Sequence, residues 1–154
     1  MEKNIAAIRQ TYSQKELLEK DVAPHPIHQF EQWWNDAVNA EISEVNAMTL
    51  ATATADGMPS ARIVLLKDFS EQGFSFFTNY DSYKGRQLAE NPKACRVFFW
   101  KELERQTRIT GLVQQLPATD SDVYFYSRPI ESQAGAITSP QSRVIESREW
   151  LHHQ

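Results

Sequence analysis

Hydrophobic residues recur at helical spacing near the start of the chain. Ile27, Phe30, Trp34 and Val38 lie three or four residues apart, and Pro26 precedes them. This spacing places side chains on one face of a helix, and proline suits the first helical turn. We therefore expect an amphipathic helix that packs across the domain.

From Ala47 onward, apolar and polar residues alternate. AMTLATATA, the turn pair Asp56-Gly57 and MPSARIVLLK together predict a β-hairpin. GFSFFTN (73–79) predicts a third strand after a polar turn at 68–72, and residues 93–102 and 105–116 predict two more. The middle of the chain is therefore expected to form a largely antiparallel sheet.

Helical patterns interrupt and follow these strands. DSYKGRQLAENP (81–92) predicts a helix that Asp81 or Ser82 caps and Asn91-Pro92 ends. TDSD (119–122) is typical of a capping box before another helix, and residues 142–151 predict a final one. This order of elements indicates an α+β fold, an antiparallel barrel or sheet with helices against it.

Length and charge narrow the class of protein. The chain has 154 residues, 41% hydrophobic and 23% charged, which suits one domain over residues 1–154. Its formal net charge is −4 and no run of Lys or Arg occurs, so nucleic acid and anionic membranes are not expected as partners. Since the sequence has no apolar run of membrane-span length and no signal-peptide core, we expect a cytoplasmic protein.

Common catalytic and metal-binding motifs are absent from the sequence. There is no P-loop, no GxGxxG, no CxxC and no recognisable nucleophile turn for Ser-His-Asp catalysis. His25 and His28 have no third ligand nearby, so we interpret them as solvated loop histidines and predict no metal. The single cysteine, Cys95, lies in an apolar stretch and is expected to be buried.

Cations and hydroxyls at strand and helix ends remain as candidates. Arg62 and Lys67 frame the apolar strand RIVLLK, and period-two geometry places them on opposite faces unless a bulge intervenes. They could hold two anions, hold one anion with the other cation in solvent, or simply be surface charges. Thr78 and Lys84 flank a helix start, which could be a phosphate seat or an ordinary capped helix.

Two further groups are compatible with ligand binding. Gln106 shares one strand face with Arg108, which suits hydrogen bonding to a flat polar ring but also a solvated face. Tyr124 and Arg128 lie one helical turn apart, and Ser132 follows. Together they form either a second phosphate clamp or a surface cation beside a packed tyrosine.

Several stretches together resemble the pyridoxine/pyridoxamine 5′-phosphate oxidase family, dimeric FMN enzymes built on a split β-barrel. The matching stretches are RIVLLK (62–67), FFTNYDSYKG (76–85), LERQ (103–106), ITG (109–111), YFYSRPIESQAGA (124–136), SPQSR (139–143) and, as a lid motif, RQTY (9–12). Their order and spacing match across almost the whole chain. The resemblance implies an α+β antiparallel split barrel with flanking helices, in which residues 1–25 form an N-terminal arm or lid.

The resemblance also implies roles for individual residues. The implied FMN contacts are Arg62 (to the phosphate), Ile63, Val64, Leu65, Phe77, Thr78, Lys84 and Gln106, with Gln141 and Ser142 reaching in at a homodimer interface. The implied substrate contacts are Lys67, Tyr124, Arg128 and Ser132, which clamp the 5′-phosphate, and Arg9 and Tyr12, which close over the vitamer. On this reading Arg62 and Lys67 grip two different phosphates. The resemblance leaves the catalytic residues unassigned.

The implied reaction oxidises pyridoxine 5′-phosphate or pyridoxamine 5′-phosphate to pyridoxal 5′-phosphate. Hydride passes from C4′ of the substrate to N5 of FMN, after which O2 reoxidises the flavin and hydrogen peroxide is released. For the amine, hydrolysis of the resulting imine gives ammonia. FMN carries the redox chemistry, and no metal is needed.

The sequence departs from the family pattern in two places. Tyr83 stands where the family usually has arginine, which removes a cation from the FMN-phosphate site. Beyond the position of Gln154 the family continues with a flavin-packing Trp and an Arg-x-His-x-Arg motif. Two readings follow: an active oxidase, or a truncated, catalytically impaired paralogue that binds flavin or vitamer. Oxidases of phenazine precursors share the flavin motifs, but the clamp around Arg128 favours a phosphorylated substrate.

Overall fold

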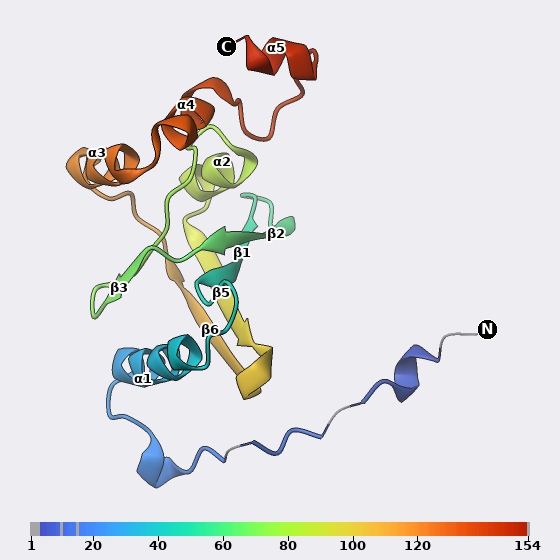
Figure 1. Ribbon diagram of the computed structural model, residues 1–154, viewed down its shortest axis with the longest axis vertical. Coiled ribbons are helices and arrows are strands. Elements are labelled where there is room, and N and C mark those ends of the chain that lie inside the picture. Colours follow the sequence, from blue (N-terminus) through green and yellow to red (C-terminus); the bar gives the residue numbers. More distant parts are fainter. Residues whose placement is uncertain (1–3, 10, 15, 154) are drawn as a thin grey trace. The chain divides into compact units, whose positions relative to one another are not determined.

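The computed structural model describes residues 4–9, 11–14 and 16–153. The helices are α1 (Pro26–Asn39), α2 (Tyr83–Glu90), α3 (Ala118–Ser127), α4 (Ile130–Thr138) and α5 (Arg148–His152), with 3-10 turns at Ile5–Ala7, Glu19–Asp21 and Lys101–Leu103 (Figure 1). The strands are β1 (Ala47–Ala53), β2 (Pro59–Leu65), β3 (Asp68–Ser70), β4 (Gly73–Ser75), β5 (Lys93–Trp100) and β6 (Arg105–Leu112). The chain forms two compact units, residues 1–45 with 99–107 and residues 46–98 with 108–154.

In the first unit, aromatic residues of α1 form a small core. Phe30 and Trp34 pack against Trp100, with ring centroids 5.8 and 6.4 Å apart. Pro26 occupies the start of the helix, as its position in the sequence predicts. Val38 was expected on the same face but is exposed, because the buried residue in this last turn is Ala37.

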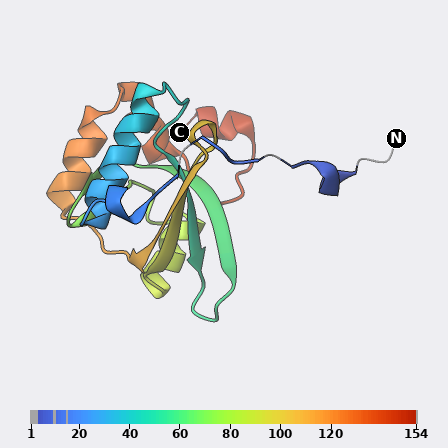
Figure 2. The ribbon, with the colours of Figure 1, turned by 90° about the horizontal axis from the view of Figure 1, so that it is seen from below.

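The second unit is built on an antiparallel hairpin. β1 pairs with β2 in a register that places Leu50 opposite Arg62, which confirms the predicted hairpin, and β1 pairs with β5 along its other edge. The strand order is β2-β1-β5-β6, and β3 and β4 form a separate two-stranded sheet. In the hairpin turn, which projects from the sheet in Figure 2, Gly57 takes a φ of +92° that glycine adopts without strain.

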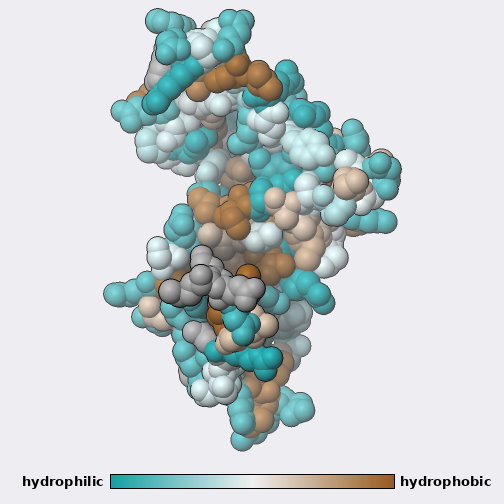
Figure 3. Space-filling view, turned by 90° about the vertical axis from the view of Figure 1, so that its right-hand side faces the viewer, coloured by the Kyte–Doolittle hydropathy of each residue, from teal (hydrophilic) through white to brown (hydrophobic). Residues whose placement is uncertain are grey.

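The two faces of this hairpin differ in burial. Leu50, Val64 and Leu66 are buried on the face that packs on α2, whereas Ile63 is 64% and Leu65 38% exposed on the other. Figure 3 likewise shows apolar side chains that reach the surface among polar ones. We call the side of the sheet that carries Ile63 and Leu65 the open face. Its residues are Thr49, Ala51, Ala61, Ile63, Leu65, Cys95 and Val97.

Two predictions for single residues are wrong. Cys95 is half-buried rather than buried, because it lies on the open face opposite Ala51. His28 lies inside α1 rather than in a loop, because the helix begins at Pro26, and His25 is the N-cap. Both histidines are nevertheless exposed, as expected.

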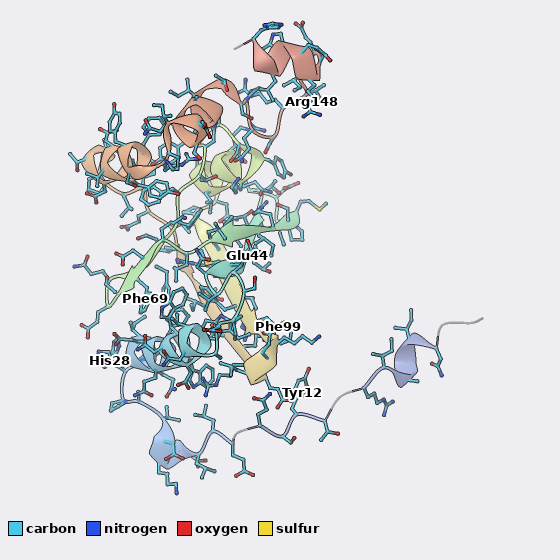
Figure 4. The ribbon with its side chains drawn as sticks, in the orientation of Figure 1. Tyr12, His28, Glu44, Phe69, Phe99 and Arg148 are labelled. Carbon is cyan, nitrogen blue, oxygen red and sulfur yellow. The ribbon has the colours of Figure 1, made fainter. Side chains whose placement is uncertain are left out.

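The strand predicted over residues 73–79 is shorter, and the turn predicted at 68–72 contains a strand. β3 pairs with β4, and Phe69 (labelled in Figure 4) stacks on Phe74 with ring centroids 6.0 Å apart. The Arg96 guanidinium also donates to the Phe74 carbonyl at 2.6 Å and lies 5.3 Å from the centre of the Phe74 ring. Because Arg96 is distant in the sequence, the polar residues around this short hairpin read as a turn.

The helices of the last third also begin differently from the prediction. α3 starts at Ala118 after Pro117, so Thr119 lies inside the first turn and no side chain caps the helix. The predicted capping box is therefore wrong. α5 covers only Arg148–His152, because Ser147 caps it, and Val144 upstream is fully exposed rather than packed. None of the helices within the described residues has the length and apolar character of a membrane span.

Candidate functional site

Four neutral oxygen atoms surround the guanidinium of Arg62 on the buried face of the hairpin. Nη1 donates to the Leu50 carbonyl (3.2 Å) and the Thr52 hydroxyl (2.6 Å). Nη2 donates to the Ser60 hydroxyl (2.7 Å) and to Gln87 Oε1 (3.2 Å). The strand register produces this arrangement, because Leu50 lies opposite Arg62 and Thr52 opposite Ser60. The arginine is thus held in place without being neutralised.

The start of α2 carries the second cation of this site. Ser82 caps the helix by accepting from the Gly85 N–H at 3.2 Å, which confirms one of the two predicted caps. Gly85 has no room for a side chain, because a β-carbon there would lie 2.1 Å from the Tyr80 carbonyl oxygen. This close approach of loop and helix sets the position of Lys84, whose ammonium donates to Gln141 Oε1 at 2.7 Å.

Arg62 and Lys84 form a pair of cations without a counter-charge. Burial lowers the pKa of the Lys84 ammonium, and the Arg62 guanidinium lowers that pKa further. Burial also lowers the pKa of Arg62, against a smaller opposing effect of Tyr83. Among the described residues, no carboxylate pairs with either cation. Such a pair favours an anion, because a bound negative charge stabilises both protonated forms.

A buried hydroxyl without a partner lies in the loop before α2. Thr78 Oγ1 makes no hydrogen bond within the part of the chain that the structure describes. Buried polar atoms are normally paired, so this atom suits a ligand that brings its own donor or acceptor. Together with the two cations, it fits a cofactor that carries a phosphate.

The three apolar residues after Arg62 divide between the two faces of the strand. Ile63 and Leu65 expose their side chains on the open face, where a flat ring has room to lie. The Val64 side chain is buried in the core. Any contact from Val64 to a cofactor would therefore come from its backbone.

A second cluster forms around Tyr124 of α3. The Lys67 ammonium lies 5.6 Å and the Arg128 guanidinium carbon 6.0 Å from the centre of the Tyr124 ring. Phe77 stacks on the same ring, with centroids 3.8 Å apart and planes 5° apart. Because Phe77 directly precedes Thr78, this stack joins the second cluster to the loop of the first.

The connection between α3 and α4 positions the cation of this cluster. Arg128 follows the last residue of α3, so it reaches Tyr124 from outside the helix rather than along one helical face. Gln133 Nε2 donates to the Arg128 carbonyl at 2.8 Å and fixes the connection. Ser132 lies in the first turn of α4, where its N–H donates to the Pro129 carbonyl at 2.9 Å.

Gln141 reaches Lys84 from a tight turn after α4. The Arg143 N–H donates to the Pro140 carbonyl at 3.1 Å, and Ser142, at the third position of the turn, has a φ of +67°. A type II turn requires such a conformation there, although few residues other than glycine adopt it readily. The turn therefore presents Gln141 to the cation site and leaves Ser142 exposed.

Arg9, Tyr12 and Gln106 belong to the first unit, and their predicted ligand contacts stay predictions. Arg9 is exposed, and so is Tyr12, which is labelled in Figure 4. The Glu104 carboxylate accepts from the next two backbone N–H groups, those of residues 13 and 14, at 2.8 and 3.0 Å. Gln106 is exposed on β6 and lines an open hollow with Trp33.

Sequence reasoning missed the polar residues that surround Arg62, namely Thr52, Ser60 and Gln87. Thr52 follows Leu50 on the core face of β1, and Gln87 lies three residues after Lys84 on α2. Both side chains are buried. A polar residue at a core position requires a hydrogen-bond partner, and this requirement could have identified Thr52 and Gln87 from the sequence.

Comparison with known proteins gives the family of the chain. A family model described as pyridoxamine 5′-phosphate oxidase matches residues 34–154. A pyridoxine/pyridoxamine 5′-phosphate oxidase from Nostoc sp. is 54% identical over 100% of this chain and 72% of its own length. The same enzyme from Thermosynechococcus vestitus is 58% identical over 93% of this chain and 68% of its own length.

Solved structures show the same fold. PhzG from Burkholderia lata, in complex with tetrahydrophenazine-1-carboxylic acid, has a TM-score of 0.85 at 31% identity over 90% of this chain and 69% of its own. A pyridoxamine 5′-phosphate oxidase-related, FMN-binding protein from Nostoc punctiforme has a TM-score of 0.65 at 15% identity over 85% of this chain and 73% of its own. These matches confirm the predicted α+β split barrel. The chain belongs to the pyridoxamine 5′-phosphate oxidase family.

Proposed function

We propose that the protein binds FMN and oxidises pyridoxine 5′-phosphate or pyridoxamine 5′-phosphate to pyridoxal 5′-phosphate, with O2 as electron acceptor. The observation that carries this proposal is the presence of two cation groups, Arg62 with Lys84 and Lys67 with Arg128. FMN and the vitamer each bring one phosphate, so two groups suit two ligands bound together. FMN, when bound, supplies a two-electron acceptor.

The residues of the chain bind and orient these ligands. Arg62 and Lys84 hold the FMN phosphate, and Thr78 offers the unpartnered hydroxyl. Ile63 and Leu65 provide an exposed apolar surface for the flavin. The other proposed FMN contacts are Val64 through its backbone, Phe77, Gln106, Gln141 and Ser142.

The second cluster binds the substrate. Lys67 and Arg128 bring two positive charges to the Tyr124 ring. These three residues and Ser132 together form the proposed clamp on the 5′-phosphate. Arg9 and Tyr12 are the proposed lid. The relatives named as vitamer oxidases are also more similar to this chain, at 54% and 58% identity, than PhzG, at 31%. Both observations support a phosphorylated vitamer over a phenazine precursor.

We also propose that the protein is a cytoplasmic homodimer with FMN at the interface. The open face supports the dimer, because Ile63 and Leu65 are exposed on an otherwise small-residue sheet surface. Exposed apolar sheet surfaces of this kind are typical of interfaces. A second copy of the chain would cover this face and the flavin together.

The test is an FMN titration of the purified protein, followed by pyridoxine 5′-phosphate in air with hydrogen peroxide as the readout. We expect bound flavin and peroxide release. Arg128→Met should raise the KM for the phosphorylated vitamer about tenfold or more and leave FMN affinity unchanged. Flavin bound without turnover would favour the flavin- or vitamer-binding alternative. Absence of flavin binding would overturn the proposal.

A further inference from the structure

We infer that Gln87 is a positioning residue of the FMN-phosphate site, whose buried carboxamide orients Arg62 and leaves its charge uncompensated. The inference rests on the proposed function, in which Arg62 binds the phosphate. Gln87 is 2% exposed, so it acts through the arginine rather than by touching the ligand.

Three donors converge on the oxygen of the Gln87 carboxamide. Thr52 Oγ1 lies 2.6 Å, Ser60 Oγ 2.8 Å and Arg62 Nη2 3.2 Å from Gln87 Oε1. A guanidinium can only donate, so the oxygen rather than the nitrogen of the carboxamide must face Arg62. The orientation of the Gln87 side chain is therefore fixed by the arginine.

This orientation leaves the other end of the carboxamide unsatisfied. Gln87 Nε2 is buried and has no hydrogen-bond partner among the described residues. A buried donor without a partner destabilises a fold, and an apolar side chain of similar volume would avoid that cost. Stability alone therefore does not account for glutamine here, whereas a requirement to hold Arg62 does.

The neutrality of Gln87 matters as much as its position. Glutamate has nearly the same shape, but at position 87 its carboxylate would pair with Arg62 and cancel the charge that attracts phosphate. The four Nη hydrogens of Arg62 are used by Leu50, Thr52, Ser60 and Gln87. The Nε–H and the full positive charge thus remain for an anion.

Gln87 also ties the two cations of the site together. It lies three residues after Lys84 on α2, and it bonds to strands β1 and β2 through Thr52, Ser60 and Arg62. The helix that carries one cation is thereby fastened to the strand that carries the other.

The experiment compares FMN with riboflavin, which has the same ring system but no phosphate, on Arg62→Met, Gln87→Met and the double variant. Arg62→Met should weaken FMN binding about tenfold to a hundredfold and leave riboflavin binding unchanged. Gln87→Met should weaken FMN binding about fivefold to thirtyfold, again without effect on riboflavin. In the Arg62→Met background, Gln87→Met should have no further effect.

The outcomes separate the inference from the proposed function. If Arg62→Met leaves FMN affinity unchanged, the phosphate assignment itself fails. If Arg62→Met weakens FMN binding but the Gln87→Met loss is additive, or equal for riboflavin, Gln87 supports only the fold and the inference is overturned.

Two further variants keep the test decisive if Gln87→Met does not fold. Gln87→Glu preserves shape and hydrogen bonding to Arg62, so a purely structural role predicts normal FMN binding. The positioning role predicts a loss as large as that of Arg62→Met with riboflavin binding retained. Ser60→Ala removes one support of Nη2 and should weaken FMN selectively, about threefold. Normal FMN affinity in both variants would overturn the inference.

Discussion

At the scale of single residues, the proposed phosphate site has a tyrosine where a third cation would fit. Tyr83 is the first residue of α2, is exposed and affects the pKa of Arg62. We expect Tyr83→Arg to tighten FMN binding about tenfold, because arginine adds charge-assisted hydrogen bonds to phosphate. Parallel titrations with FMN and riboflavin measure this gain. Tyr83→Phe is the control and should change little, whereas unchanged FMN affinity in Tyr83→Arg would place the phosphate away from this turn.

The lowered pKa of Lys84 gives the site a pH dependence. As pH rises through this pKa the ammonium loses its proton, so FMN affinity should fall at a lower pH than for an exposed lysine. The stability of the ligand-free protein should change in the opposite direction. The unfolded chain binds the proton more tightly than the folded one, so the free energy of unfolding rises with pH between the folded and unfolded pKa values.

Lys84→Arg tests this prediction, because arginine stays charged across the range. FMN affinity measured against pH should fall for the wild type and stay level for Lys84→Arg. Riboflavin serves as the control for ionisation of the ring. A parallel fall in both proteins would assign the pH dependence to another group.

At the scale of elements, α2 depends on its close contact with the preceding loop. Gly85→Ala should destabilise the protein by about 1–3 kcal/mol and weaken FMN binding, because the added carbon would push α2 away from the Tyr80 carbonyl. Gly135→Ala is the matched control, since nothing lies within 4 Å of its β-carbon position in α4. It should stabilise the protein by about 0.5–1 kcal/mol. Denaturant unfolding compares the two, and equal effects would contradict this account of α2.

Elements with local signals could be predicted from the sequence. The alternation over 47–65 gave the hairpin, and Ser82 with Asn91 marked the ends of α2, because these features depend on neighbouring residues. β3 was missed because its support includes a contact from the distant Arg96 to Phe74, and the start of α3 was misplaced because Pro117 begins the helix earlier than Thr119.

Only those residues of the candidate site that belong to a local sequence motif could be predicted. Arg62, Lys84, Lys67 and Arg128 stood out as cations beside strand and helix ends. Gln87 did not, because its role depends on a buried network that joins residues 25 to 35 positions apart. Such contacts arise from tertiary packing and leave no local pattern.

At the scale of the whole molecule, the open face is the expected dimer contact. Ile63→Lys should shift the protein from dimer to monomer, because a charge at this exposed apolar position cannot be buried without a partner. Light scattering coupled to size exclusion measures the mass. Val123→Lys, at an exposed position on α3, is the control and should leave the mass unchanged. A wild-type protein that is already monomeric would contradict the proposed dimer.

The five-residue separation of Arg62 and Lys67 has a consequence for how this sequence can change. Leu66 is buried and Lys67 exposed, so the alternation continues past the end of β2 and keeps the two cations on opposite sides. Substitutions within this stretch alter one side at a time. Deletion of one residue between Arg62 and Lys67 would instead move Lys67 to the side of Arg62. The apolar side chains that follow the deletion would then point to the opposite face of the strand. Insertions and deletions of an odd number of residues should therefore not be tolerated in this segment. Conservative substitutions at Ile63, Val64 and Leu65 should be tolerated.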